Sequence, residues 1–306
     1  MTLREELKTL WSNWRKELGA EHLPGLCADF KETVLCLATR LEDGDAGAFP
    51  VLVFELYDLE RRWLNAVNAG IISKRAPMPA AMIGDMINRI TERVNLVLIS
   101  PPDRRAVDII VRNLQEEASE LVSDDELAMI RERLSSSDAE DVITAVCRVA
   151  EIGAFAKASI IPLLLEFMAR GSFEVREPEK VPLQEDVRSA LEKAVGTQTC
   201  CGRPLRFKDM LVSCGKPFVV AVCPKCSREH VIYPPYFVIE SYEPVEEMPP
   251  PMDLHGAAVK FFSRIPAFCP ACWDKLEFKY VAEGAKLAYV CSNCSRRFCA
   301  PIADLS

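Results

Sequence analysis

The chain has 306 residues, of which 37 are Lys or Arg and 45 are Asp or Glu, giving a net charge of −8. This length predicts roughly two or three domains, and 49% hydrophobic against 27% charged residues excludes a wholly disordered chain. An isoelectric point near 5.2 argues against a protein that holds nucleic acid through bulk charge. The N-terminus lacks the apolar region of a signal peptide, and the most apolar stretch, 159–169, is too short to span a bilayer. We therefore expect a cytoplasmic protein without membrane contact.

Residues 1–102 predict a helical region whose role stays open. Thr2 to Glu5 has the pattern of a capping box, and Gly19 suits the end of the helix that follows. The apolar residues of that helix recur at three- and four-residue spacing, which places them on one face; they are Leu7, Leu10, Trp11, Trp14 and Leu18. Further helices are expected over 25–41, 46–69 and from about residue 78 to just before Ser100, and no strand is expected.

Residues 103–197 predict helices in pairs: 103–119 with 123–134, and 137–153 with a partner from Pro162 to about Arg170. Capping boxes are expected at Ser123 and Ser137, and Gly153 is expected to end its helix.

The second of these pairs resembles a known repeat. Its pattern is Asp141-Val142-(x)2-Ala145-Val146-(x)2-Val149-Ala150-(x)-Ile152-Gly153, followed by Ile161-Pro162-Leu163-Leu164, and this resembles a HEAT repeat. Asp186 to Gly196 resembles the first helix of the next repeat, 45 residues further on, a spacing typical of the family. Two features depart from the family: the connection 171–183 is long and charged, and the last repeat lacks a second helix. The resemblance implies an α-solenoid whose extended surface binds other proteins.

Composition changes near residue 197. Residues 1–197 hold 24 basic and 34 acidic side chains, whereas residues 198–306 hold 13 and 11. Ten of the thirteen cysteines follow residue 199, and six of these form three C-x-x-C pairs. Because no secretory signal is evident, such pairs indicate metal ligands rather than disulfides. Two chemically different modules are therefore expected to join near residue 197.

The last two C-x-x-C pairs predict a zinc site in residues 263–306. Cys269/Cys272 and Cys291/Cys294 are separated by 18 residues, a spacing typical of tetrahedral zinc bound by four thiolates. Strands are expected over 276–280 and 287–290, around a turn at Gly284. This segment resembles a zinc ribbon of the rubredoxin-like kind.

A second ribbon is predicted upstream, over 198–243, as a degenerate copy of the first. Cys223 and Cys226 match Cys291 and Cys294 at an offset of 68, and Cys201 matches Cys272 at an offset of 71. The residue that should match Cys269 is Gln198, whose amide is a poor zinc ligand beside thiolates. Cys200 is the best candidate for the fourth ligand, and Cys214 and His230 are the alternatives.

These two ribbons predict two structural zinc ions, because four thiolates leave no open coordination position. The eight predicted ligands are Cys200, Cys201, Cys223, Cys226, Cys269, Cys272, Cys291 and Cys294. A Pro- and Glu-rich connector over 244–262 is expected to be extended. Side chains at the ribbon tips that can contact phosphates or bases are Arg228, Arg296, Arg297 and Phe298.

The sequence contains no phosphate-binding glycine loop, dinucleotide fingerprint, H-E-x-x-H or G-x-S-x-G motif. We therefore expect a multidomain protein, an all-α HEAT-like module followed by two small β zinc ribbons. Its expected function is that of a non-enzymatic adaptor with a protein partner and no small-molecule substrate. Two alternatives remain: a nucleic-acid-associated protein whose ribbons contact DNA or RNA, and an enzyme with a site in the first hundred residues.

Overall fold

The computed structural model describes residues 2–18, 24–73, 76, 78–169 and 173–306. The chain folds into two compact units: the first is Met1–Pro178 with Ser213–Gly215, and the second is Glu179–Val212 with Lys216–Ser306. The change in charge and cysteine content near residue 197 falls at the end of a helix inside the second unit. No helix among the described residues is long and apolar enough to span a bilayer.

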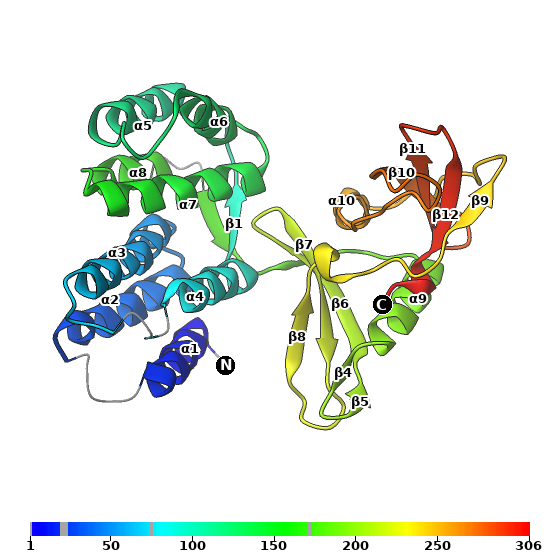
Figure 1. Ribbon diagram of the computed structural model, residues 1–306, viewed down its shortest axis with the longest axis horizontal. Coiled ribbons are helices and arrows are strands. Elements are labelled where there is room, and N and C mark those ends of the chain that lie inside the picture. The colour runs from blue at the N-terminus through cyan, green and yellow to red at the C-terminus, as the bar shows by residue number, and fades with distance from the viewer. Residues whose placement is uncertain (1, 19–23, 74–75, 77, 170–172) are drawn as a thin grey trace. The chain divides into compact units, whose positions relative to one another are not determined.

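The first unit is built mainly of helices (Figure 1). Helix α3 is central, since it contacts α2, α7 and α8, while α1 contacts α2 and α4, and α5 contacts α6 and α8. The elements are α1 (Leu3–Leu18), α2 (Pro24–Glu42), α3 (Ala48–Asn68), α4 (Ala80–Arg93), β1 (Asn95–Leu98), α5 (Arg104–Glu117), α6 (Asp124–Leu134), α7 (Ala139–Ala156), α8 (Ile161–Ala169) and β2 (Phe173–Arg176).

The predicted helix starts are largely confirmed by their caps. The Glu5 amide donates to the Thr2 hydroxyl over 3.2 Å, and the Thr2 amide donates to the Glu5 carboxylate over 2.9 Å, which is a complete capping box. The Ser123 hydroxyl accepts from the Glu126 amide at the start of α6. At α7 the cap is Asp138 rather than Ser137, because the Asp138 carboxylate reaches the Glu140 amide. Gly19 lies outside the described residues.

Gly153 does not end α7, which continues to Ala156 and finishes with Lys157 in the left-handed region. A Cβ at residue 153 would lie 2.2 Å from Cγ2 of Ile160. Glycine at residue 153 therefore permits close packing of the α7–α8 connection and is not a C-cap.

Two strands were not predicted from the sequence. β1 pairs antiparallel with β2, with Asn95 opposite Arg176 and Leu98 opposite Phe173. Val94 and Val97 continue the helical stripe of α4, and periodicity alone does not separate a short buried strand from a helix. Pairing with a segment about eighty residues away along the chain decides in favour of the strand.

The second unit contains two four-stranded antiparallel sheets and two helices in one hydrophobic core. The sheet orders are β3-β6-β7-β8 and β10-β11-β12-β9. The elements are β3 (Glu179–Lys180), α9 (Glu185–Gly196), β4 (Thr199–Cys200), β5 (Arg203–Pro204), β6 (Arg206–Ser213), β7 (Lys216–Val222), β8 (Glu229–Ile232), η1 (Pro234–Tyr236), β9 (Glu243–Val245), α10 (Gly256–Phe262), β10 (Leu276–Ala282), β11 (Lys286–Cys291), β12 (Arg297–Pro301) and η2 (Ile302–Asp304).

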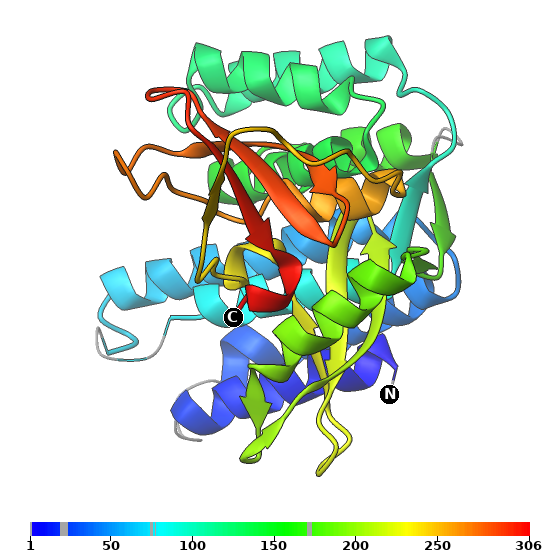
Figure 2. The ribbon, with the colours of Figure 1, turned by 90° about the vertical axis from the view of Figure 1, so that its right-hand side faces the viewer.

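Helix α9 belongs to this second core and does not begin a further repeat of the helical unit. Its apolar side chains, including Val187, Leu191 and Val195, are fully buried there. The helix lies beside η2, as Figures 1 and 2 show. The ribbons of the second unit therefore cover the apolar face of α9.

The predicted connector 244–262 is partly built into the fold. β9 is an edge strand that pairs with β12, and α10 buries Phe261 and Phe262 in the shared core. Ring centroids of Phe261 and Phe237 lie 5.8 Å apart. Apolar residues at the end of the Pro-rich segment therefore fix it to the ribbons instead of leaving an extended linker.

The two ribbons are related by a local two-fold axis. Val238 and Ser306 are equivalent residues at the offset of 68, and each donates its amide to the other's carbonyl, over 2.9 and 3.0 Å. The 3-10 turns η1 and η2 precede them at the same offset. Equivalent residues that hydrogen-bond reciprocally lie about a two-fold axis. The duplication predicted from the cysteines thus extends to the way in which the copies pack.

Candidate metal centres

The structure brings all eight predicted cysteine ligands together in two groups of four. The first group is Cys200, Cys201, Cys223 and Cys226, and the second is Cys269, Cys272, Cys291 and Cys294. Within each group all sulfur atoms lie within 4.8 Å of one another. Each group is able to hold a metal ion.

Three of the four cysteine-bearing turns share one backbone geometry. At Cys291 the cysteine amide donates to the carbonyl of Arg296 over 2.9 Å, and the Ser295 amide donates back to the Cys291 carbonyl over 2.9 Å. The same two bonds recur in the turns that begin at Cys223 and Cys269. The fifth residue of each turn has a left-handed φ, and these residues are Ser227 (56°), Trp273 (64°) and Ser295 (57°). This geometry aims the two sulfurs of a C-x-x-C pair at one point.

The fourth turn is rebuilt, and this lets adjacent cysteines face one centre. Cys200 pairs with Arg203 across a two-residue hairpin whose central residues, Cys201 and Gly202, have φ of 54° and 70°. Two successive left-handed residues are typical of a type I′ hairpin turn. Cys200 thus stands on strand β4 and Cys201 in the turn itself.

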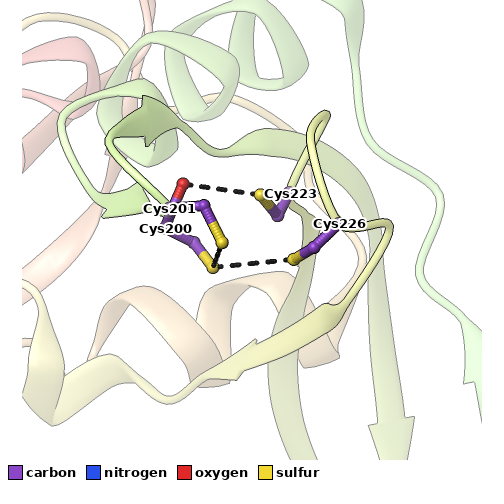
Figure 3. A group of neighbouring side chains, drawn as sticks. All are labelled: Cys200, Cys201, Cys223 and Cys226. Carbon is purple, nitrogen blue, oxygen red and sulfur yellow. Dashed lines mark hydrogen bonds between the residues drawn. The ribbon is translucent and has the colours of Figure 1, made fainter.

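A two-residue deletion accounts for this difference between the ribbons. The Leu276 amide donates to the Ala267 carbonyl and closes a ten-residue segment, while the Leu205 amide donates to the Gln198 carbonyl and closes an eight-residue one. Gln198 therefore marks the base of the loop and is not a ligand position. Dashed lines in Figure 3 join the Cys200 sulfur to those of Cys201 and Cys226.

The distances between sulfur atoms suit a tetrahedral ion. They are 3.7 Å for Cys200–Cys201 and 3.9 Å for Cys200–Cys226. In the second group they are 3.7 Å for Cys269–Cys294 and 3.4 Å for Cys272–Cys291. Zinc–sulfur bonds of about 2.3 Å in a tetrahedron place neighbouring sulfurs about 3.8 Å apart, whereas a disulfide requires about 2.05 Å. The donor set and its spacing therefore fit zinc.

The two groups differ in exposure. In the second group two cysteines are buried and two are half-buried, whereas in the first group Cys201 and Cys226 are exposed and only Cys223 is buried. The first centre is therefore the more accessible to solvent and to chelators.

Backbone amides favour ionisation of one thiol in each group. The Cys226 amide, followed by that of Lys225, lowers the pKa of Cys223 to about 7. The Cys294 amide does the same for Cys291, whose pKa is also lowered to about 7. A thiolate that accepts hydrogen bonds from N–H groups is stabilised over the thiol. The matching values reflect the matching turns.

The alternative ligands for the first centre lie elsewhere. Cys214 is fully buried in the first unit, where its sulfur donates to the Val94 carbonyl over 3.3 Å and accepts from the Leu96 amide over 3.4 Å. His230 lies on β8 opposite Ala221 and is not part of the four-cysteine group.

The ribbon tips contain two aromatic side chains that the sequence analysis missed, Trp273 and Phe268. Phe298 was expected at a tip, but only 3% of it is exposed, because it lies in the core of the second sheet. Trp273 is 81% exposed and Phe268 is 54% exposed. Alignment of the three turns was the signal that could have found Trp273, since a tryptophan replaces the serine of the other two.

Comparison of the chain with protein-family models, with curated protein sequences and with solved structures finds no match, so the two four-cysteine groups rest on this chain's own sequence repeat and geometry.

Proposed function

We propose that this chain is a non-enzymatic adaptor in which two structural zinc ions hold the second unit together. The observation that carries the proposal is the pair of four-cysteine groups with tetrahedral sulfur spacing. Four thiolates saturate zinc, so neither ion keeps a position for water or substrate. The metal then contributes folding free energy, on the order of 10–16 kcal/mol apparent in small zinc peptides.

The first unit supplies the surface for a protein partner in this proposal. Its pair α7–α8, which contacts α5 and α6, is the part that resembles a HEAT repeat, and such helix pairs present broad surfaces. Large apolar side chains are exposed on α5, in its connection to α6, and on α6, namely Ile109 (43%), Leu121 (48%) and Met129 (41%). Exposed apolar side chains on neighbouring helices favour a protein contact.

Elemental analysis tests the metal. Protein purified without added metal is expected to contain about one to two zinc ions per chain, because the second centre is better enclosed than the first. A chain with no zinc, or with iron in its place, contradicts the structural-zinc proposal.

Affinity capture tests the adaptor role. The tagged full chain is used to capture proteins from its native cell, with and without nuclease, and the captured protein is then rebound as a purified component. The double variant Ile109→Ser with Met129→Ser should lose this protein while keeping zinc and helical circular dichroism. Ile71→Ser, at a residue 74% exposed outside α5 and α6, is the matched control and should bind normally. Complete loss of captured proteins on nuclease treatment contradicts a direct protein partner.

A further inference from the structure

The metal end of the second ribbon has an exposed tryptophan that the fold does not require. Trp273 occupies the left-handed fifth position of its turn, at φ 64°, where the other two turns have Ser227 and Ser295. A bulky residue in this conformation is unusual, and serine is sufficient to form the same two backbone hydrogen bonds. With 81% of its surface exposed, the indole ring contributes little to the core.

A second aromatic ring stands on the same turn. Phe268 is 54% exposed and forms an isolated antiparallel bridge with Lys275, so the two side chains are cross-strand neighbours. Its amide donates to the Tyr242 hydroxyl over 3.2 Å, which fixes the backbone beneath the ring. The loop closed by the Phe268–Lys275 bridge therefore displays two aromatic side chains beside the second four-cysteine group.

The side chains at the metal end of the second ribbon are mostly basic. Segments 263–276 and 292–297 contain four basic residues, Arg264, Lys275, Arg296 and Arg297, and one carboxylate, Asp274. The Asp274 carboxylate accepts a hydrogen bond from Nδ2 of the Asn293 side chain, which links the two cysteine turns. A zinc ion with four thiolates contributes about −2. The end thus keeps a positive excess when the metal is counted, although the chain as a whole has a net charge of −8.

The first ribbon serves as an internal comparison. The matching segments 197–205 and 223–229 are also basic, with Arg203, Lys225 and Arg228 against Glu229. Its shortened turn, however, leaves no place for a residue equivalent to Trp273, and Thr199 occupies the position equivalent to Phe268. Charge is common to both ribbons, whereas the aromatic pair belongs to the second alone.

We propose that the metal end of the second ribbon binds single-stranded nucleic acid, with bases stacked on Trp273 and Phe268 and phosphates contacting Lys275 and Arg296. Exposed aromatic rings combined with basic side chains are what single-stranded nucleic acid requires, since every base offers a face for stacking. The binding is independent of sequence, because the turn offers rings and charges and few groups that read base edges. This inference rests on the proposed zinc ion, which holds the two turns together.

Fluorescence anisotropy of a labelled oligouridylate and an oligothymidylate of about 12 nucleotides tests the proposal on the zinc-loaded full chain. Trp273→Ser, which installs the residue of the other two turns, should weaken binding about ten-fold. Lys275→Gln should weaken it too and should reduce its dependence on salt. Binding should also quench tryptophan emission in the wild type but not in Trp273→Ser, because the other three tryptophans, Trp11, Trp14 and Trp63, are buried.

Tyr236→Ser is the matched control, since Tyr236 is an aromatic residue 69% exposed in the same unit but outside both cysteine turns. It should leave the affinity unchanged. Equal affinity of Trp273→Ser and wild type overturns the proposal, as does a lack of oligonucleotide binding at low salt. Binding to anionic phosphatidylserine vesicles in place of oligonucleotide also overturns it and assigns the rings to a membrane. Zinc content is measured on each sample, so that loss of the metal, which contradicts the proposed function, is distinguished from loss of binding alone.

Discussion

Two neighbouring tyrosines of the second ribbon differ in how their hydroxyl groups are satisfied. Tyr242 accepts a hydrogen bond from the Phe268 amide, whereas the Tyr289 hydroxyl is buried and has no partner among the described residues. Burial, followed by the proximity of Tyr242, raises the pKa of Tyr289. An unpaired buried hydroxyl costs stability, while a paired one contributes to it.

Tyr289→Phe is therefore expected to stabilise the second unit by about 1 kcal/mol, and Tyr242→Phe to destabilise it by about the same amount. Denaturant unfolding of the zinc-loaded chain measures both. The pKa of Tyr289 is higher in the folded than in the unfolded state. The free energy of unfolding should therefore fall as pH rises above about 10, the pKa of an unfolded tyrosine. This alkaline loss should be smaller in Tyr289→Phe. Equal destabilisation by both variants would show that the Tyr289 hydroxyl has a partner.

Cys200 and Cys214, both considered as ligands of the first centre, have different surroundings. Cys200→Ser should lose one zinc ion, because it removes one of four thiolates from the more exposed group. Cys214→Ser should keep both ions, because Cys214 contacts Val94 and Leu96 instead of a metal group. Elemental analysis of both variants measures this, and the reverse result would identify Cys214 as the ligand.

At the scale of elements, the hairpin between β6 and β7 is divided between the two units. Its tip, Ser213–Gly215, is part of the first unit, where the Cys214 amide donates to the Asn95 side chain over 2.8 Å. Gly215 has φ 71°, and a Cβ there would lie 2.8 Å from both the Asp138 carboxylate and the Glu140 amide. These two atoms form the N-cap of α7, so the glycine permits the cap and the hairpin tip to meet.

Gly215→Ala should destabilise the first unit by more than the roughly 1 kcal/mol typical of a left-handed glycine, because steric overlap adds to the backbone cost. Gly284→Ala is the matched control, since Gly284 has φ 76° in the β10–β11 turn and nothing within 4 Å of its Cβ position. Thermal unfolding compares them, and hydrogen exchange at the Leu96 amide reports whether the tip is displaced. Equal effects of the two substitutions would mean that the tip does not press against the cap.

At the scale of the whole molecule, the two units have separate hydrophobic cores, and only the second contains the cysteine groups. Cys223, Cys269 and Cys291 are fully buried in that one core, together with residues of α9 and α10. Loss of the proposed metal from either group should therefore remove support from the core that both ribbons share.

A strong chelator should leave most of the helical circular-dichroism signal, which comes from α1–α8, while amides of the second unit lose hydrogen-exchange protection. Leu191 on α9 is the most informative probe, because its side chain is 0% exposed and lies in the ribbon core. A peptide from α3 is the control and should remain protected. If chelation melts the whole chain in a single transition, the two units depend on one cooperative core.

Much of the local structure was determined by the sequence alone. Capping boxes at Thr2 and Ser123 predicted two helix starts, since caps depend on residues only three apart. Strands around Gly284 and the grouping of cysteines likewise followed from spacing within each ribbon. These features are local, or repeated at a constant offset, and a sequence displays them directly.

The tertiary structure alone decided the rest, because each remaining feature depends on partners far away along the chain. The stripe of α9 predicted a buried face but not that the ribbons would cover it. Residues 95–98 became a strand only because residues 173–176 lie beside them. Adjacent cysteines reach one centre only through a hairpin with two left-handed residues, and burial of Phe298 with exposure of Trp273 depends on the packing of the second sheet. An apolar pattern predicts that a face is buried, but only the tertiary structure shows which elements cover that face.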